Sequence, residues 1–171
     1  MSKKVTTKIS DGLFYDERSA GGIVYRIEGG GVKWLVIKTA TSKRTGAKGR
    51  YRSDAIYKLP KGHLKQGEFL KAAAVREVEE EGKIKAKVIT KIGSNNYNIV
   101  DKATRKKIIK KVTFFLMEYT EDSRLRYFDA EVVLERAWLP FEEATAKLAY
   151  DSEKVLLRKA KERLEISQKS K

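Results

Sequence analysis

The chain contains no cysteine and only one histidine among its 171 residues. Without cysteine there can be no disulfide, no thiolate metal site and no cysteine nucleophile, and this composition fits a reducing compartment. A single histidine cannot form the histidine pair of a typical zinc site. A serine triad is also disfavoured, because His63 adjoins an acidic segment and the chain has no G-x-S-x-G motif.

The sequence also lacks a long apolar run. No stretch approaches the roughly 20 apolar residues of a membrane span, and residues 1–12 have no apolar core like that of a signal peptide. We therefore expect a soluble, cytoplasmic protein that does not contact a membrane. The length and the hydrophobic content of 41% predict one domain over residues 1–171, with flexible ends at 1–12 and 167–171.

Acidic side chains are outnumbered by basic ones, 23 against 38, which gives a formal net charge of +15. A surface with this charge attracts polyanions such as nucleotides, inositol phosphates or RNA. Part of the excess is concentrated in two segments, residues 43–52 and 102–111. Composition alone does not separate a binding face from a solvated, lysine-rich surface, so both interpretations stay open.

Hydrophobic patterning predicts a mixture of strands and helices. Two β-rich runs joined by a glycine-rich turn, residues 19–27 and 32–39, predict a hairpin. Residues 40–54 are polar and lack apolar periodicity, so we expect a mobile surface loop there. The alanine-rich, proline-free segment 69–82 is the strongest helix. Further strands are predicted at 55–59, 85–92, 97–100, 108–120 and 137–139, and further helices at 141–149 and 152–166.

The predicted helix carries three carboxylates on one face. At 100° per residue, Glu77, Glu80 and Glu81 fall within an arc of roughly 100°, whereas Glu79 points to nearly the opposite side. Like charges at these spacings destabilise a helix, so the cluster needs a cation or exposure to solvent. Carboxylate oxygens are the ligands that Mg²⁺ prefers, and Arg76 lies one turn before Glu80, where it can orient that carboxylate. A simply solvated acidic face is the alternative.

The fixed residues around this helix resemble the signature of Nudix hydrolases, G-x5-E-x7-R-E-U-x-E-E-x-G-U, in which U is aliphatic. The matching positions are Gly62, Glu68, Arg76, Glu77, Val78, Glu80, Glu81 and Ile84. Lys83 stands where the family has its second glycine, and we expect Gly82 to supply the left-handed residue that ends the helix. The segments SAGGIVYR, LPKGHLKQGE, KKVTFFLMEY and ERAWLPFEEA resemble the branch that hydrolyses diadenosine polyphosphates and diphosphoinositol polyphosphates.

The resemblance implies an α/β fold, an α/β/α sandwich with a mixed β-sheet, in which the signature forms a loop-helix-loop catalytic motif. It implies metal binding by Glu80 and Glu81, with Glu77 as a ligand or general base and Gly62 as a ligand through its carbonyl. Glu68 and Arg76 would hold the loop and orient the catalytic glutamates. The cofactor would be Mg²⁺ or Mn²⁺. The reaction would be hydrolysis of a phosphoanhydride bond, with a dinucleoside polyphosphate as the first choice of substrate.

Other residues are weaker candidates for the site. Lys61 and His63, in the loop before the helix, could contact a phosphate, although a lone histidine such as His63 is more often an ordinary loop residue with a local hydrogen bond. Tyr97 could stack on a base or pack in the sheet. The family commonly has a further carboxylate base at a variable position. Glu131 and Glu135 are candidates for it, with a role as plain surface glutamates as the alternative.

Two other functions remain open at this stage. The high positive charge also suits an RNA 5′-end pyrophosphohydrolase. A non-catalytic module of the same fold could bind a nucleotide or RNA as a sensor, although the intact Glu77, Glu80 and Glu81 disfavour lost catalysis. The expected partner is therefore a phosphorylated, nucleotide-like small molecule, with RNA as the alternative.

Overall fold

The structure is a computed structural model of the 171-residue chain. It describes residues 7–8, 14–15, 17–45, 50–100, 105, 107–126 and 133–169, with side chains for 17–40, 55–100, 105, 107–126 and 133–169. The strands and helices of this described part are β1 (Thr7–Lys8), β2 (Phe14–Tyr15), β3 (Glu17–Glu28), β4 (Gly31–Thr45), β5 (Arg50–Lys58), β6 (Lys61–His63), α1 (Leu70–Gly82), β7 (Ile84–Val100), β8 (Lys107–Asp122), β9 (Val133–Leu139), α2 (Phe141–Lys147) and α3 (Asp151–Lys169).

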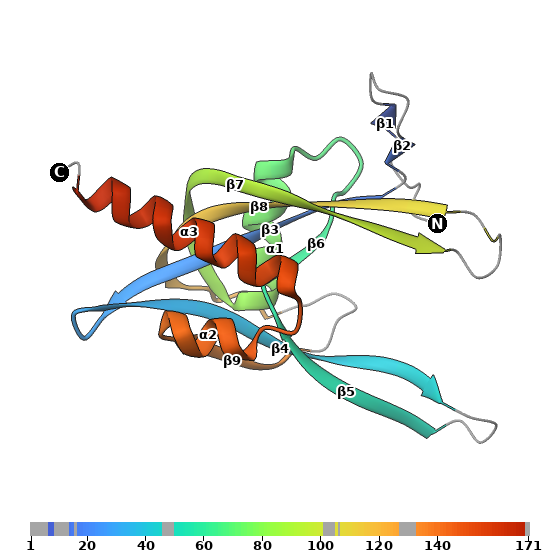
Figure 1. Ribbon diagram of the computed structural model, residues 1–171, viewed down its shortest axis with the longest axis horizontal. Coiled ribbons are helices and arrows are strands. Elements are labelled where there is room, and N and C mark those ends of the chain that lie inside the picture. The colour runs from blue at the N-terminus through green and yellow to red at the C-terminus, as the bar shows by residue number, and fades with distance from the viewer. Residues whose placement is uncertain are drawn as a thin grey trace.

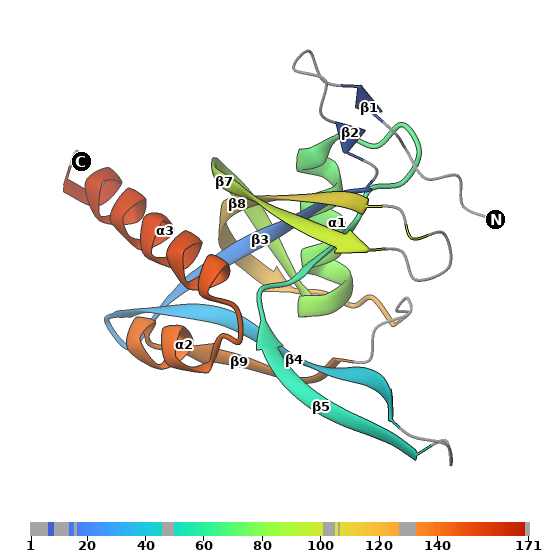
Figure 2. The ribbon, with the colours of Figure 1, turned by 45° about the vertical axis from the view of Figure 1, so that its right-hand side comes forward.

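A mixed sheet forms the middle layer, and seven of the described strands belong to it. Its order is β5-β4-β3-β8-β7, with β6 added beside β3 and β9 beside β4. The pair β3 and β8 is parallel, whereas the other pairs are antiparallel. Helix α1 lies on one side of this sheet, and α2 and α3 lie on the other (Figures 1 and 2). The predicted α/β/α sandwich is therefore confirmed.

Each side of the sheet has its own hydrophobic core. Ile23 and Phe114 face α2 and α3 and pack with Leu157, whereas Val24 and Met117 pack with Val78 of α1. Successive strand residues point to opposite faces, so neighbours such as Ile23 and Val24 serve different cores. Strand β3 is buried from residue 19 to 25 because helices cover both of its faces.

The predicted hairpin of β3 and β4 is confirmed, and its turn contains Gly29 and Gly30 at φ 59° and 77°. The mobile loop predicted for residues 40–54 is wrong. Strand β4 continues to Thr45 and pairs with β5 from Arg50 onward. Backbone hydrogen bonds pair these two strands without any alternation of apolar and polar side chains. The polar sequence of this hairpin therefore gave no sign of a strand. The basic side chains of segment 43–52 lie outside the described side chains.

One further expectation about the strands also needs correction. Strand β7 runs unbroken from Ile84 to Val100, although two separate strands were predicted there. Near the two ends of the chain, β1 pairs with β2 and α3 continues to Lys169.

Among the described residues, no helix combines the length and apolar character needed to cross a membrane.

Helix α1 ends at Gly82, and Lys83 directly after it adopts the left-handed conformation at φ 57° and ψ 32°. The expectation that Gly82 would do so is wrong, because Gly82 is the last helical residue. A Cβ on Gly82 would lie 3.0 Å from Leu35, so this glycine serves close packing. The departure from the signature therefore changes the residue at the helix end, while the left-handed backbone is present.

A pair of substitutions at Lys83 measures the strain of this helix end. Both Lys83→Gly and Lys83→Ala remove the bond from Lys83 Nζ to the Leu125 carbonyl. Only glycine adopts the left-handed conformation without a Cβ penalty, so Lys83→Gly should be more stable than Lys83→Ala by about 1 kcal/mol. Urea unfolding of the two variants gives this difference. Equal stabilities would mean that the helix end is not strained.

Candidate active site

Helix α1 packs closely on strand β3. Gly22 of β3 provides the space, since a Cβ there would lie 2.4 Å from Cγ2 of Val78. Because the helix lies so close to the sheet, glutamates beside the helix face that packs on β3 are buried as well. Glu77 and Glu81 are only 8% and 9% exposed, which is unusual for glutamate.

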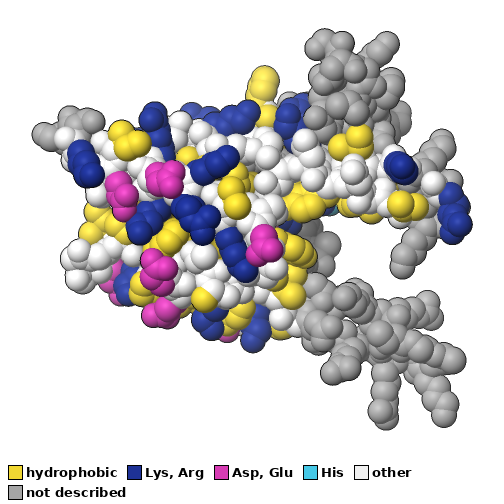
Figure 3. All heavy atoms as spheres, viewed as in Figure 1, with side chains coloured by type: hydrophobic (Ala, Val, Ile, Leu, Met, Phe, Trp, Pro, Cys, Tyr) yellow, Lys and Arg dark blue, Asp and Glu magenta, His cyan; other side chains and the backbone are white. Residues whose placement is uncertain are grey.

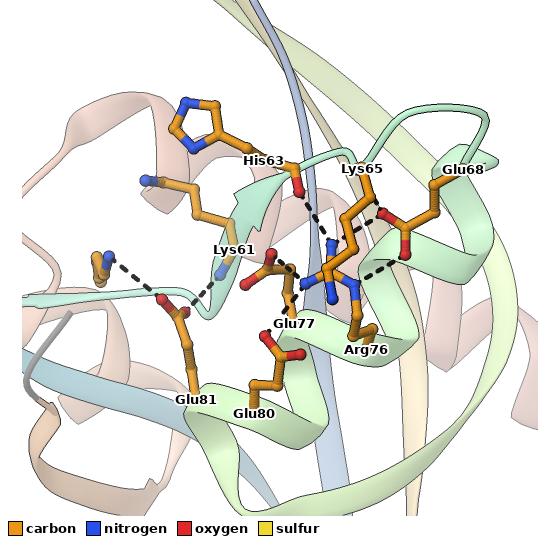
Figure 4. A network of polar contacts seen from close by, with 9 residues as sticks. Lys61, His63, Lys65, Glu68, Arg76, Glu77, Glu80 and Glu81 are labelled. Atoms are coloured by element: carbon orange, nitrogen blue, oxygen red, sulfur yellow. Dashed lines mark hydrogen bonds and ion pairs between the residues drawn. The ribbon is translucent and has the colours of Figure 1, made fainter. Parts of the chain in front are cut away.

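Arg76 joins the loop before α1 to the carboxylates of the helix (Figure 4). Its Nε and Nη2 donate to the two oxygens of Glu68, each at 2.8 Å. Its Nη1 donates to Glu77 at 2.7 Å and to Glu80 at 3.1 Å, and Nη2 also donates to the carbonyl of His63 at 2.9 Å. The structure therefore places Arg76 where it orients both Glu77 and Glu80.

Glu68 holds Arg76 in this position. The guanidinium of Arg76 is the largest influence on Glu68 and keeps the pKa of its carboxyl below the ordinary value of 4.5. The backbone N–H of Lys65 donates to Glu68 at 2.8 Å and acts in the same direction. Hydrogen bonds to Glu68 are in turn the largest cause of the raised pKa of Arg76, so both groups stay charged.

Glu77 lies directly against Gly62. A Cβ on Gly62 would come within 2.2 Å of the Glu77 carboxylate, so no other residue fits at position 62 without a shift. Burial raises the pKa of Glu77, and the nearby Arg76 opposes that rise in part. The carboxylate is therefore poorly solvated and would gain from an additional cation.

Glu81 is held by the segment that leads into the loop. The backbone N–H of Lys61 donates to its Oε2 at 2.8 Å, and Lys58 Nζ lies 3.8 Å from its Oε1. Arg136 of β9 donates to the backbone carbonyl of Glu81 at 2.7 Å. Sequence reasoning missed Lys58 and Arg136. For Lys58, the sequence does hold one indication, because a lysine within the otherwise apolar strand 55–59 needs a partner for its charge.

Glu79 points away from these groups and accepts a hydrogen bond from Ser123 Oγ at 2.6 Å. Among the described residues, no three acidic or histidine side chains converge closely enough to form a ready metal site. Arg76 and Lys58 instead contact the carboxylates. Even so, the donor set consists of carboxylates and backbone carbonyls, the oxygen ligands that suit Mg²⁺ or Mn²⁺. The residues present therefore fit a hard divalent cation by their chemistry.

His63 and Lys61 both lie on β6 beside the start of β3. The Nε2 atom of His63 is 3.3 Å from Glu17 Oε2 and 3.4 Å from Lys110 Nζ. Its side chain is largely exposed, and β6 places it one residue after Gly62. The backbones of Lys61 and His63 thus lie at the carboxylate group, because the Lys61 N–H donates to Glu81 and the His63 carbonyl accepts from Arg76. A contact of either side chain with phosphate stays a prediction.

Tyr97 and Glu135 lie on the other face of the sheet. Tyr97 packs on the core beneath α3, and its hydroxyl is 3.3 Å from Ser152 Oγ. Glu135 accepts a hydrogen bond from Tyr57, which packs on the same core, whereas the next residue of β9 reaches Glu81. The structure therefore does not bring either residue to Glu77, Glu80 and Glu81. Glu131 lies outside the described residues.

A cavity of about 520 Å³ is present at the other end of β3. It is lined by Arg26, Ile27, Glu28, Glu118 and Tyr119. Ala20, the partner of Gly62, precedes Arg26 by six positions, which corresponds to roughly 20 Å along a strand. The cavity is therefore separate from the carboxylate group.

Comparisons with known proteins agree with this geometry. The family model described as NUDIX domain matches residues 16–159. The chain is 35% identical over 146 residues to the protein named MutT4 of Mycobacterium tuberculosis, and the match covers 85% of this chain and 55% of that protein. The chain thus spans about half the length of this curated relative.

Three solved structures illustrate the similarity in fold. A NUDIX hydrolase from Nitrosomonas europaea has a TM-score of 0.59 at 18% identity, with 84% of this chain and 86% of that chain covered. A binary complex of a C. elegans Ap4A hydrolase has a TM-score of 0.57 at 21% identity, with coverage of 86% and 97%. A mutT/nudix family protein from Listeria innocua has a TM-score of 0.59 at 22% identity, with coverage of 92% and 99%. At these identities the similarity shows a shared fold.

The substitution Glu68→Gln tests the ion pair with Arg76. Because the folded-state pKa of Glu68 is depressed, its ionised form stabilises the fold above about pH 4.5, and this contribution is lost as the pH falls through the folded-state pKa. The variant should lower the free energy of unfolding near neutral pH by about 1.5–3 kcal/mol, and the difference should shrink in acid. Urea unfolding of the metal-free protein across this pH range measures it.

Glu162→Gln on the exposed surface of α3 is the matched control. It should change the free energy of unfolding by less than about 0.5 kcal/mol. A loss of stability in Glu68→Gln that does not depend on pH would contradict the ion-pair explanation.

Proposed function

This chain belongs to the Nudix family, and from that membership we propose that it hydrolyses a phosphoanhydride bond in a nucleotide-like substrate with a divalent cation as cofactor. The observation that carries the proposal is the arrangement of Glu77, Glu80 and Glu81 on α1 beside Gly62. Arg76 orients two of these carboxylates. All five residues occupy matching positions of the family signature.

The cation, Mg²⁺ or Mn²⁺, would be held by Glu80 and Glu81, with Glu77 and the Gly62 carbonyl as further ligands. When bound, it would neutralise phosphate charge, polarise the phosphorus centre and lower the pKa of an attacking water. Alternatively, Glu77 would be the general base that accepts a proton from this water. Arg76 keeps Glu77 and Glu80 in fixed orientations during this transfer.

For the substrate we propose a dinucleoside polyphosphate. The similarity of the flanking segments to the diadenosine polyphosphate branch supports this choice, and a C. elegans Ap4A hydrolase shares the fold. The hairpins β4–β5 and β7–β8 project from the same end of the sheet on either side of β6 (Figure 1). A long polyphosphate between them would meet Lys61 and His63 on β6 and Lys110 on β8.

The first test is metal-dependent hydrolysis of nucleoside triphosphates, diadenosine polyphosphates and 5′-triphosphorylated RNA, with Glu80→Gln as the inactive variant. Loss of a proposed metal ligand should lower kcat by more than about 100-fold, since even groups that only support ligands contribute 10–100-fold. Glu79→Gln is the matched control, because Glu79 is next in sequence but contacts Ser123. It should stay within about threefold of the wild type. Equal loss in both variants would count against the proposed ligand set.

RNA 5′-end hydrolysis is the second candidate, and the net charge of +15 favours it. Figure 3 shows basic side chains at the far end of the β7–β8 hairpin, whereas on α2 and α3 both charge signs are mixed. Within segment 102–111, the basic residues that the structure describes are Arg105, Lys107, Lys110 and Lys111.

Comparing the two substrates separates these candidates. We expect a kcat/KM for diadenosine tetraphosphate at least about tenfold above that for release of pyrophosphate from triphosphorylated RNA, because a site built for one substrate discriminates on this scale. Both reactions are followed at the same metal and salt concentrations, since RNA binding weakens steeply with salt. Much faster turnover of the RNA would make RNA hydrolysis the function.

A non-catalytic sensor of the same fold is the remaining alternative. Nucleotide binding without metal-dependent turnover of any of these substrates would favour it. We also propose that residues 1–171 form one domain, because both core clusters share a single sheet. We further propose that the reaction takes place in the cytoplasm, since a chain without cysteine fits a reducing compartment.

A further inference from the structure

The segment between β5 and β6 crosses from one strand of the sheet to another. Strands β3 and β4 pair over four residues next to their turn and then separate. Strand β5 follows β4 as far as Lys58, and β6 begins on β3 at Lys61. Leu59 and Pro60 lie between the two ladders, and Pro60 has no N–H to donate. The buried amides of this crossing therefore need acceptors from outside the sheet.

Two helices on opposite sides of the sheet supply these acceptors. The N–H of Lys61 donates to Glu81 Oε2 of α1 at 2.8 Å, and the N–H of Leu59 donates to Glu153 Oε2 of α3 at 2.9 Å. Only Pro60 separates the two amides. The crossing is thus fixed from both faces just before Gly62.

Glu153 is a costly residue for helix packing alone. Its side chain is 0% exposed, and its Oε1 has no hydrogen-bond partner within the described part of the chain. Burial raises the pKa of Glu153, while Lys61 and Lys58 act against that rise. Burying an apolar side chain of similar size at this position would cost less free energy. The carboxylate therefore fits a specific need for a strong acceptor at the Leu59 amide.

A second set of contacts connects the start of α3 to the same strand. The N–H of Ala149 donates to the carbonyl of Tyr57 at 3.0 Å, and Leu148 forms a bridge with Tyr57. Leu148 and Leu59 also belong to one core cluster. The residues that precede and begin α3 therefore hold positions 57 and 59, and a shift of this helix would be passed to Gly62.

We propose that Glu153 is a positioning residue for the reaction, acting through the Leu59 amide to set the backbone at Lys61 and Gly62. This inference rests on the proposed function, in which Lys61 contacts phosphate and Gly62 is a metal ligand. Glu153 itself touches neither the substrate nor the reacting atoms. A misplacement of about 1 Å can cost on the order of 100-fold in rate, so the effect belongs in kcat.

Two substitutions of similar side-chain size distinguish the effect of losing the hydrogen-bond acceptor at position 153 from the effect of altered packing. Glu153→Met removes the acceptor, whereas Glu153→Gln keeps an acceptor oxygen. We expect Glu153→Met to lower kcat by roughly 10–100-fold with less than a threefold change in KM, and Glu153→Gln to keep at least about a third of the wild-type kcat. Leu164→Ala controls for lost stability, because Leu164 is buried on α3 roughly 16 Å along the helix from Glu153.

Amide hydrogen exchange of the metal-free protein is a second readout that does not depend on turnover. Glu153→Met should raise the exchange rates of the Leu59 and Lys61 amides by about tenfold relative to amides of β8, and Leu164→Ala should not. The proposal is overturned if Glu153→Met behaves like Leu164→Ala in both kcat and exchange.

The outcomes also separate this proposal from the proposed function. If the wild type hydrolyses no substrate while the exchange result holds, the proposed function has failed, and with it the catalytic part of this proposal, although the contact itself stands. If Glu153→Met does not fold, Glu153→Asp replaces it. That carboxylate is one methylene too short to reach the Leu59 amide, so the same losses of kcat and of amide protection are expected.

Discussion

Glu77 and Glu81 are buried between α1 and the sheet, so the protein itself must supply their hydrogen-bond donors. Arg76 donates to Glu77, and the Lys61 amide donates to Glu81, with which the Lys58 ammonium also forms an ion pair. These residues lie on α1, at the end of β5 and at the start of β6. Burying the two carboxylates therefore also fixes the path of the chain into β6. This path brings the backbone against Glu77, where any Cβ at position 62 would require the Glu77 carboxylate to shift.

The spacing of the signature predicted the part of this arrangement that follows from helix geometry. Glu77, Glu80 and Glu81 share a face, and Arg76 reaches Glu80 one turn away, because residues three and four apart are neighbours on a helix. The supports of the site were not predicted. The bonds of Arg136 and Glu153 join residues 55 and 94 positions apart. No local pattern indicates such contacts, since they arise only when the layers pack together.

The sequence indicates more readily that a residue lies in a strand than which face of the sheet its side chain occupies. Strand β7 has three register shifts against β8, and each shift alters the alternation of inward and outward residues. Simple alternation therefore does not tell whether Tyr97 faces α1 or α3. The polar hairpin of β4 and β5 shows a related limit, because backbone pairing forms it without a hydrophobic pattern. Lys83 shows that a required backbone conformation can be met by an unfavoured residue.

The two carboxylates that hold the crossing act from opposite sides. Glu81 and Glu153 bind amides on either side of Pro60, whose ring fixes φ. The crossing cannot move toward one helix without lengthening its bond to the other, because a carboxyl oxygen accepts from the backbone on each side. Because α1 carries the proposed metal ligands and α3 belongs to the opposite layer, the packing of the whole sandwich sets how Gly62 meets Glu77. Site geometry and fold stability are therefore coupled through these two hydrogen bonds as well as through the cores.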